Sequence, residues 1–152
     1  MIRSAVIDST GVYRYSLTRI WEPCLSRVGW IMLNPSTADA EADDATIRRC
    51  LQFSRDLGFG SLVVVNLYAL RSTDPDELLR SKIDPTGPEN AVFVRKELSL
   101  CAQQIAAWGA HPAARGQFSN LYGELLCLGR TKSGEPRHPL YVRKDAKLEL
   151  WP

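Results

Sequence analysis

Four short motifs in this sequence carry side chains that can bind a ligand or take part in catalysis, and three of them directly end an apolar run. The motifs are Asn34-Pro35-Ser36-Thr37, Asn66, Trp108-Gly109 and His138-Pro139. A side-chain amide offers both a donor and an acceptor, and an imidazole can gain or lose a proton near neutral pH. If the motifs meet in space, two amides, an imidazole and an aromatic ring would line one site.

The apolar runs that precede these motifs predict strands, at 30–34, 61–66, 105–109 and 125–128. They alternate with helix-forming stretches, which predicts an α/β protein. We expect a three-layer fold with a central four-stranded, mostly parallel sheet and helices on both faces. Sites in open parallel sheets form at the carboxyl ends of the strands, so the motifs should converge at one edge, with His138 in a loop beyond the fourth strand.

The rest of the chain fits a single α/β domain over 1–152, with an N-terminal β-hairpin at 1–21. A helix is predicted within 43–60, capped by Asp43 or Asp44 and stopped near Gly58, and a second around 88–103. The apolar residues of the first helix fall on one face: Ile47, Cys50, Leu51 and Leu57. Residues 129–145 are rich in Gly, Pro and charge, and we interpret them as a C-terminal functional loop.

Composition limits the classes of protein to consider. A chain of 152 residues, 45% of them hydrophobic, suits one core. The net charge of +2 does not by itself indicate a polyanion partner, although basic residues gather after position 129. No C-x-x-C pair suggests zinc, and no leader or membrane-spanning run is evident. We expect a cytoplasmic protein with four reduced core cysteines, and neither a metal nor a cofactor.

Longer stretches resemble an uncharacterised family catalogued as domain of unknown function 1643. They cover nearly the whole chain: MLNPSTAD, DDATIRR, VVNLYALRSTDP, AWG and LGRTKSGEPRHPLY. That resemblance implies no activity. A more distant similarity is to the uracil-DNA glycosylase superfamily. Proteins of that superfamily carry, in this order, an Asp-Pro or Asn-Pro turn, an Asn after the second strand, a Trp-Gly and a His-Pro loop. The four motifs here match that order, and the resemblance implies the same fold.

The superfamily resemblance implies roles for individual residues. Asn34 would position an attacking water, Asn66 would read the edge of a flipped-out base, and His138 would donate to the base oxygen that becomes negative as the base leaves. It also implies further contacts to the substrate, from Pro35, Ser36, Thr37, Trp108, Gly109 and Pro139. Phosphates of a nucleic-acid backbone would meet Arg71, Lys132 and Arg137.

This chain departs from the superfamily pattern in two places. Ser36 and Thr37 stand where an aromatic ring usually stacks on the base, so we assign that role to Tyr68. The segment HPLYV replaces a longer loop with a wedging leucine, and Leu140 or Tyr141 would have to serve instead. Excision of ordinary uracil is therefore not implied.

We predict a glycosylase-like protein that recognises a nucleobase or nucleotide, with excision of a modified base from nucleic acid as the candidate reaction. Two alternatives stay open. One is a non-catalytic nucleotide- or nucleic-acid-binding module on the same fold. The other is a metal-dependent nuclease that uses the acids within 39–44, although capping a helix and complementing its dipole is the simpler interpretation of those acids.

Overall fold

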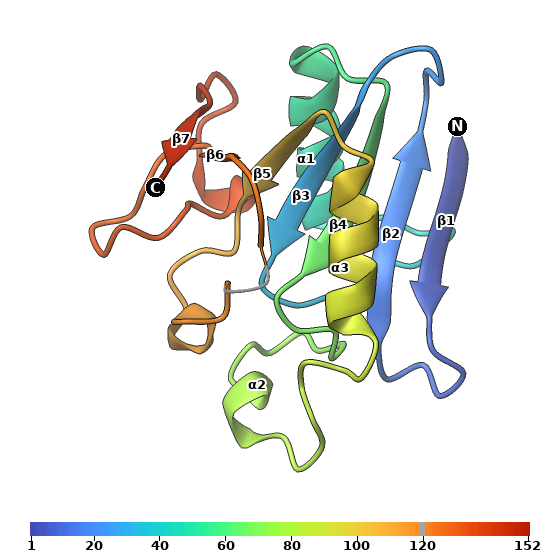
Figure 1. The fold of residues 1–152 in the computed structure, drawn as a ribbon, viewed down its shortest axis with the longest axis vertical. Coiled ribbons are helices and arrows are strands. Elements are labelled where there is room, and N and C mark those ends of the chain that lie inside the picture. The colour runs from blue at the N-terminus through green and yellow to red at the C-terminus, as the bar shows by residue number, and fades with distance from the viewer. Residues whose placement is uncertain (119–120) are drawn as a thin grey trace.

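The computed structural model describes residues 1–118 and 121–152, and a seven-stranded mixed sheet forms its centre (Figure 1). Strand β3 pairs in parallel with β4 and β5, and β5 pairs in parallel with β6. The β1–β2, β2–β4 and β6–β7 pairs are antiparallel. Across the sheet the order is β1 (Ile2–Ile7), β2 (Arg14–Ile20), β4 (Ser61–Asn66), β3 (Arg27–Met32), β5 (Gln103–Ala106), β6 (Leu125–Cys127) and β7 (Glu149–Trp151).

The α/β class predicted from the alternating pattern is confirmed, but the sheet is larger than the four strands expected. Two strands, β1 and β2, extend one edge, and β7 extends the other. Strand β7 has only three residues, two of them exposed, so it leaves no apolar periodicity in the sequence. The predicted strands at 30–34 and 105–109 end earlier than expected. Strand β3 stops two residues before Asn34, and β5 stops two residues before Trp108.

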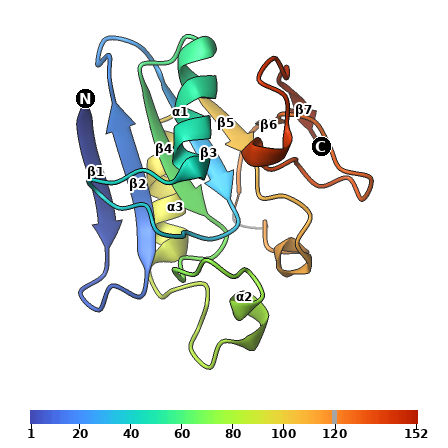
Figure 2. The same cartoon turned by 180° about the vertical axis from the view of Figure 1, so that it is seen from behind.

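Helices cover both faces of the sheet, as Figures 1 and 2 show from opposite sides. On one face α1 (Ala45–Asp56) packs Ile47 and Cys50 into a core with Trp30 of the sheet. On the other face α3 (Asn90–Ser99) packs Val94 and Leu98 into a second core. Because β3 and β4 are buried on both faces, their sequences are continuous apolar runs rather than alternating ones.

Helix α1 begins where a carboxylate can cap it. Asp44 Oδ1 accepts a hydrogen bond from Ile47 N at 2.9 Å, so Asp44 rather than Asp43 is the cap. Just after the helix, Gly58 adopts a positive φ of 87°, a backbone conformation that glycine adopts without strain. Leu57 does not share the buried face that the sequence predicted. It lies beyond the last helical residue and is 40% exposed.

The shorter elements lie in the connecting loops. Helix α2 (Glu77–Arg80) and the 3₁₀ turns η1 (Pro112–Ala114) and η2 (Pro139–Tyr141) are the ones described. No helix in the described part of the chain is long and apolar enough to cross a membrane. All four cysteines are free, but the expectation that they are core residues is wrong for Cys24, which is exposed.

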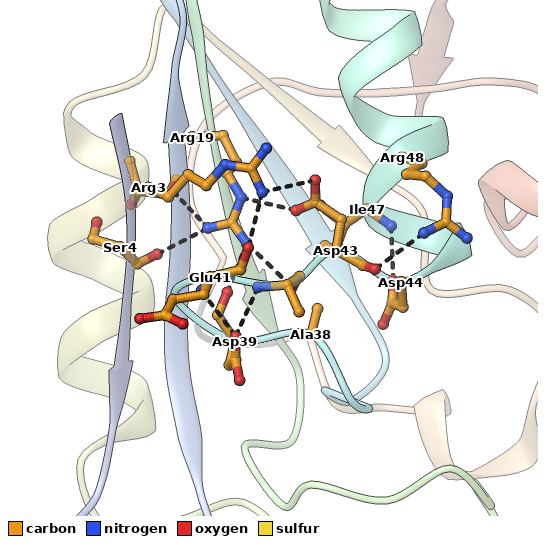
Figure 3. Close-up of polar contacts among 12 residues, drawn as sticks. Arg3, Ser4, Arg19, Ala38, Asp39, Glu41, Asp43, Asp44, Ile47 and Arg48 are labelled. Atoms are coloured by element: carbon orange, nitrogen blue, oxygen red, sulfur yellow. Dashed lines mark hydrogen bonds and ion pairs between the residues drawn. The ribbon is translucent and has the colours of Figure 1, made fainter. Parts of the chain in front are cut away.

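The run of acids before α1 is held in place by a buried arginine of β2 (Figure 3). Arg19 is fully buried, and its Nε donates to Asp43 Oδ1 at 2.9 Å. Its Nη2 donates to Asp39 O at 2.6 Å, and its Nη1 donates to Thr18 O and Ser4 O. These contacts fix the loop over 38–44 against the sheet. That loop delivers α1, and the first turn of α1 forms one wall of the cavity described next.

Candidate functional site

A cavity of about 590 Å³ lies beyond the carboxyl ends of β3, β4 and β5. Its size falls within the range of about 300–1,000 Å³ that is usual for small-molecule sites. The cavity contains at least one residue from each of the four motifs. Of the residues that the sequence proposed, it is lined by Asn34, Ser36, Asn66, Trp108, Gly109, Arg137, His138, Leu140 and Tyr141.

Asn66, the last residue of β4, presents a buried amide without a partner. The residue is 1% exposed, and neither its Nδ2 nor its Oδ1 has a hydrogen-bond partner among the described residues. Its backbone is fixed, because Asn90 Nδ2 donates to Asn66 O at 2.9 Å and to Leu67 O at 3.3 Å. Each unpaired buried polar group costs roughly 1–3 kcal/mol. A rigid donor and a rigid acceptor are therefore free to meet a ligand.

Asn34 is held by its nitrogen, which leaves its oxygen free. Nδ2 donates to Pro35 O and Ser72 O, both at 3.0 Å, and to Leu70 O at 3.3 Å. Three carbonyls around one atom identify that atom as the nitrogen. No described residue donates to Asn34 Oδ1. The side chain therefore joins the loops after β3 and β4, and its remaining oxygen can accept a hydrogen bond from water.

His138 caps the 3₁₀ turn η2, which fixes its tautomer. Its Nδ1 accepts a hydrogen bond from Leu140 N at 3.2 Å, so the proton of the neutral ring is on Nε2. Burial lowers the pKa of His138 below its usual value of 6.5, and the charge of Asp44 opposes that shift only in part. A neutral imidazole with a free Nε2–H donor therefore faces the cavity at neutral pH.

The loop that carries His138 is anchored from two sides. At the end of β5, Trp108 Nε1 donates to Glu135 Oε2 at 2.8 Å and Gly109 N donates to Pro136 O at 2.9 Å. From α1, Arg49 Nε donates to Pro139 O at 3.1 Å, and its Nη2 donates to Val142 O. Trp108 itself is 2% exposed, so its main role is to support this loop.

The profile of a family described as "Protein of unknown function (DUF1643)" matches residues 14–140. The chain belongs to this family. The matched range includes Asn34, Asn66 and His138, so the family segment contains the centre of the cavity. No curated protein and no solved structure matches the chain.

Several residues proposed from the sequence lie outside the cavity in this family member. Tyr68 is buried in the core on the α3 face, where its hydroxyl donates to Ala113 O at 2.7 Å. This placement contradicts the predicted stacking role of Tyr68. The cavity lining also excludes Pro35, Thr37, Pro139, Arg71 and Lys132. Pro35 and Pro139 are buried, Arg71 is partly buried, and Thr37 and Lys132 are exposed.

The structure adds a cavity residue that the sequence did not suggest, Arg14 at the start of β2. It is 2% exposed, and its Nη1 donates to Ala38 O at 2.9 Å. An arginine in a segment with alternating polar residues usually faces solvent, so the pattern around it gave no signal. The cavity is also lined by the polar residues Asp44, Thr46, Ser72, Thr73 and Thr131.

Three of the four acids within 39–44, on which the nuclease alternative depends, already have partners. Asp39 Oδ1 accepts from Glu41 N and Ala42 N, Asp43 pairs with Arg19, and Asp44 caps α1. Within residues 1–118 and 121–152, no three His, Cys, Asp or Glu side chains form a group that could hold a metal ion. The structure therefore gives the metal-dependent nuclease no specific support.

The lowered pKa of His138 should make the protein less stable in mild acid. As the pH falls below about 6.5, the unfolded chain binds a proton at residue 138 that the folded chain resists, so the free energy of unfolding falls until the pH reaches the folded pKa. In His138→Asn the cap is kept, because an Asn oxygen can accept from Leu140 N. Melting temperatures between about pH 8 and pH 5 should fall less steeply for the variant. Parallel profiles would contradict this prediction.

Proposed function

We propose that the cavity binds a nucleobase, as part of a nucleotide or nucleic acid, and that the protein is glycosylase-like. One observation carries the proposal. The amide of Asn66 is buried with both its donor and its acceptor unpaired, in the same cavity as Asn34 and His138. The edge of a nucleobase that carries a carbonyl beside an N–H would pair with both amide atoms at once. A ligand without that edge would leave them unpaired, which gives the site its selectivity.

The chemistry that fits these groups is hydrolysis of the N-glycosidic bond. Water adds its oxygen to C1′, the bond from C1′ to the base nitrogen breaks, and the base leaves with the electron pair. The proton lost by the water ends on solvent or on the departed base, because an amide cannot accept it. Asn34 Oδ1 would orient the water, and His138 Nε2–H would stabilise negative charge on the base oxygen.

The finer fold assignment, to the uracil-DNA glycosylase superfamily, is part of the same proposal. It is supported by the order of the four motifs along the chain and by their common cavity. A non-catalytic nucleotide-binding module would use the same contact from Asn66. Formation of abasic sites in a panel of DNAs with modified bases, or release of free base from nucleotides, separates the enzyme from the binding module.

Replacing Asn66 with leucine should abolish nucleobase binding without harming the fold. Leucine has a similar size, and it removes two buried polar atoms that have no partners, so the melting temperature should stay equal or rise. Asn90→Leu is the matched control. Asn90 is also buried, at 3% exposed, but its Nδ2 donates hydrogen bonds to Asn66 O and Leu67 O. Losing these two hydrogen bonds in Asn90→Leu should lower the melting temperature.

Calorimetric titration with nucleosides and nucleotides measures the loss of binding in Asn66→Leu. Thermal unfolding of both variants measures the change in melting temperature. Unchanged affinity in Asn66→Leu would remove Asn66 from the site. A melting temperature that falls as far as that of Asn90→Leu would show that the amide has a structural role instead.

A further inference from the structure

We propose that Arg14 binds a terminal phosphate of the ligand, so that the preferred ligand is a nucleoside monophosphate rather than a base within a continuous strand. This inference rests on the proposed function for the nucleobase part of the ligand. The phosphate part rests on Arg14 itself, whose burial, charge and placement are independent of Asn66 and His138.

Arg14 is a buried cation with no ion-pair partner among the residues that the structure describes. It is 2% exposed, its side chain makes one hydrogen bond, to the neutral carbonyl of Ala38, and its buried Nε has no partner within residues 1–118 and 121–152. Among the residues that the structure describes, no carboxylate forms an ion pair with it. Burial lowers its pKa to about 10, which still leaves the side chain charged at neutral pH. A buried charge of this kind is costly unless a charge of opposite sign is supplied.

A second arginine on the same strand shows what a structural role requires. Arg19 is also buried, and it has Asp43 at 2.9 Å together with backbone carbonyls of three loop and strand segments. The chain therefore supplies hydrogen-bond and ion-pair partners for the buried guanidinium of Arg19. The guanidinium of Arg14 is left with unpaired donors beside the cavity. This difference between two arginines of β2 indicates that the partner of Arg14 comes from outside the chain.

A β-bulge directs Arg14 into the cavity. Strand β1 pairs Val6 with Ser16 and Ile7 with Arg14, so Tyr15 is an extra residue in β2. The Tyr15 ring stacks on Phe93 of α3 at 5.1 Å, whereas Arg14 reaches Ala38 and the cavity on the opposite face. Bulges often occur next to functional sites, where they redirect a side chain.

The surroundings of Arg14 favour a phosphate. A guanidinium offers parallel N–H donors that match two phosphate oxygens. Ser36 and Thr46 line the same cavity, and Thr46 lies in the first turn of α1, where the helix dipole favours an anion. Asp44 also lines the cavity and attracts Arg14, but its Oδ1 is held by Ile47 N. A phosphate monoester carries two negative charges, so it can compete with the single charge of Asp44 for the Arg14 guanidinium.

The burial of Arg14 favours a terminal phosphate monoester over an internal phosphodiester. An internal phosphodiester has chain leaving on both sides, so it suits an exposed arginine at the surface. A side chain that is 2% exposed can be reached only by a group that ends there. A terminal monoester on a single nucleotide meets that requirement.

Calorimetry and thermal shift on the full chain test this proposal with Arg14→Met and with Arg55→Met as the charge-matched control, since Arg55 is exposed in the last turn of α1, outside the cavity lining. Wild type should bind a nucleoside 5′-monophosphate about tenfold or more tightly than the matching nucleoside, the usual worth of a charge-assisted hydrogen bond. Arg14→Met should abolish that preference and leave nucleoside affinity unchanged, whereas Arg55→Met should keep the preference. The melting temperature of Arg14→Met should not fall, because a buried charge is removed.

Three results would overturn the proposal. They are equal affinity of the wild type for nucleoside and monophosphate, an unchanged preference in Arg14→Met, and a fall in its melting temperature as large as that of Arg19→Met. Inorganic phosphate alone tests the anion site separately. If no nucleoside or nucleotide binds but phosphate raises the melting temperature of wild type and not of Arg14→Met, the phosphate site is supported and the nucleobase proposal fails. No response to phosphate in that case would overturn both.

Discussion

Replacing His138 with alanine should slow base release by about a hundredfold or more while affinity for the substrate changes little. The neutral Nε2–H of His138 is fixed by the bond from Leu140 N to Nδ1, so it needs no rearrangement to meet a base oxygen. Negative charge develops on that oxygen only as the glycosidic bond breaks. The donor therefore stabilises the transition state more than the bound substrate, and its loss affects turnover rather than binding.

His138→Asn separates this role from a structural one, because asparagine can cap η2 but does not supply the imidazole Nε2–H. Single-turnover rate and melting temperature should be measured on the same preparation of each variant. We expect His138→Asn to keep a melting temperature near that of wild type at neutral pH and to be nearly as slow as His138→Ala. A normal rate in a folded His138→Asn protein would exclude this histidine from the reaction.

Replacing Arg19 with methionine should lower the free energy of unfolding by about 3–5 kcal/mol, the usual effect of breaking a buried ion pair. Asp43 would lose the cation at 2.9 Å, and the carbonyl of Asp39 would lose its 2.6 Å donor. The loop over 38–44 would then be attached to the sheet chiefly through Arg14 and Arg3, which contact Ala38 O and Glu41 O. Denaturant unfolding measures the change.

Arg48→Met is the matched control for that experiment. Arg48 is exposed and also contacts the acidic loop, through a 3.0 Å bond from its Nη1 to Asp43 O. Exposed contacts of this kind usually contribute less than about 1 kcal/mol. Equal losses in the two variants would show that burial of Arg19 is not what gives the contact its strength.

Elements that follow local rules could be predicted from the sequence. Strand β4 is a wholly buried apolar run that ends at Asn66, and its predicted bounds of 61–66 are those observed. Helix α1 combines apolar periodicity with a capping carboxylate at Asp44 and a glycine just after its end. The meeting of the four motifs in one cavity follows from the rule that sites form at the carboxyl ends of parallel strands.

The remaining features depend on contacts that are distant in the sequence. Arg14 and Arg19 are buried by the 38–44 loop and the first turn of α1, which fold over a strand that would otherwise have a solvent-facing side. The bulge at Tyr15 is a register shift between two strands, so neither strand reveals it alone. Tyr68 was misassigned because, beyond a strand end, the period of two no longer shows which face a side chain takes.

Two cavity residues with unpaired buried polar atoms, Asn66 and Arg14, also affect how members of this family can diverge. In a lineage that no longer uses the cavity, apolar residues at both positions would stabilise the fold. Selection removes mainly substitutions that make a protein too unstable, so these substitutions would be accepted. Such members should lose the amide and the guanidinium early, while Arg19 and its acidic loop persist. Retention of both polar residues in a sequence would then distinguish members that still bind a ligand from members that keep only the scaffold.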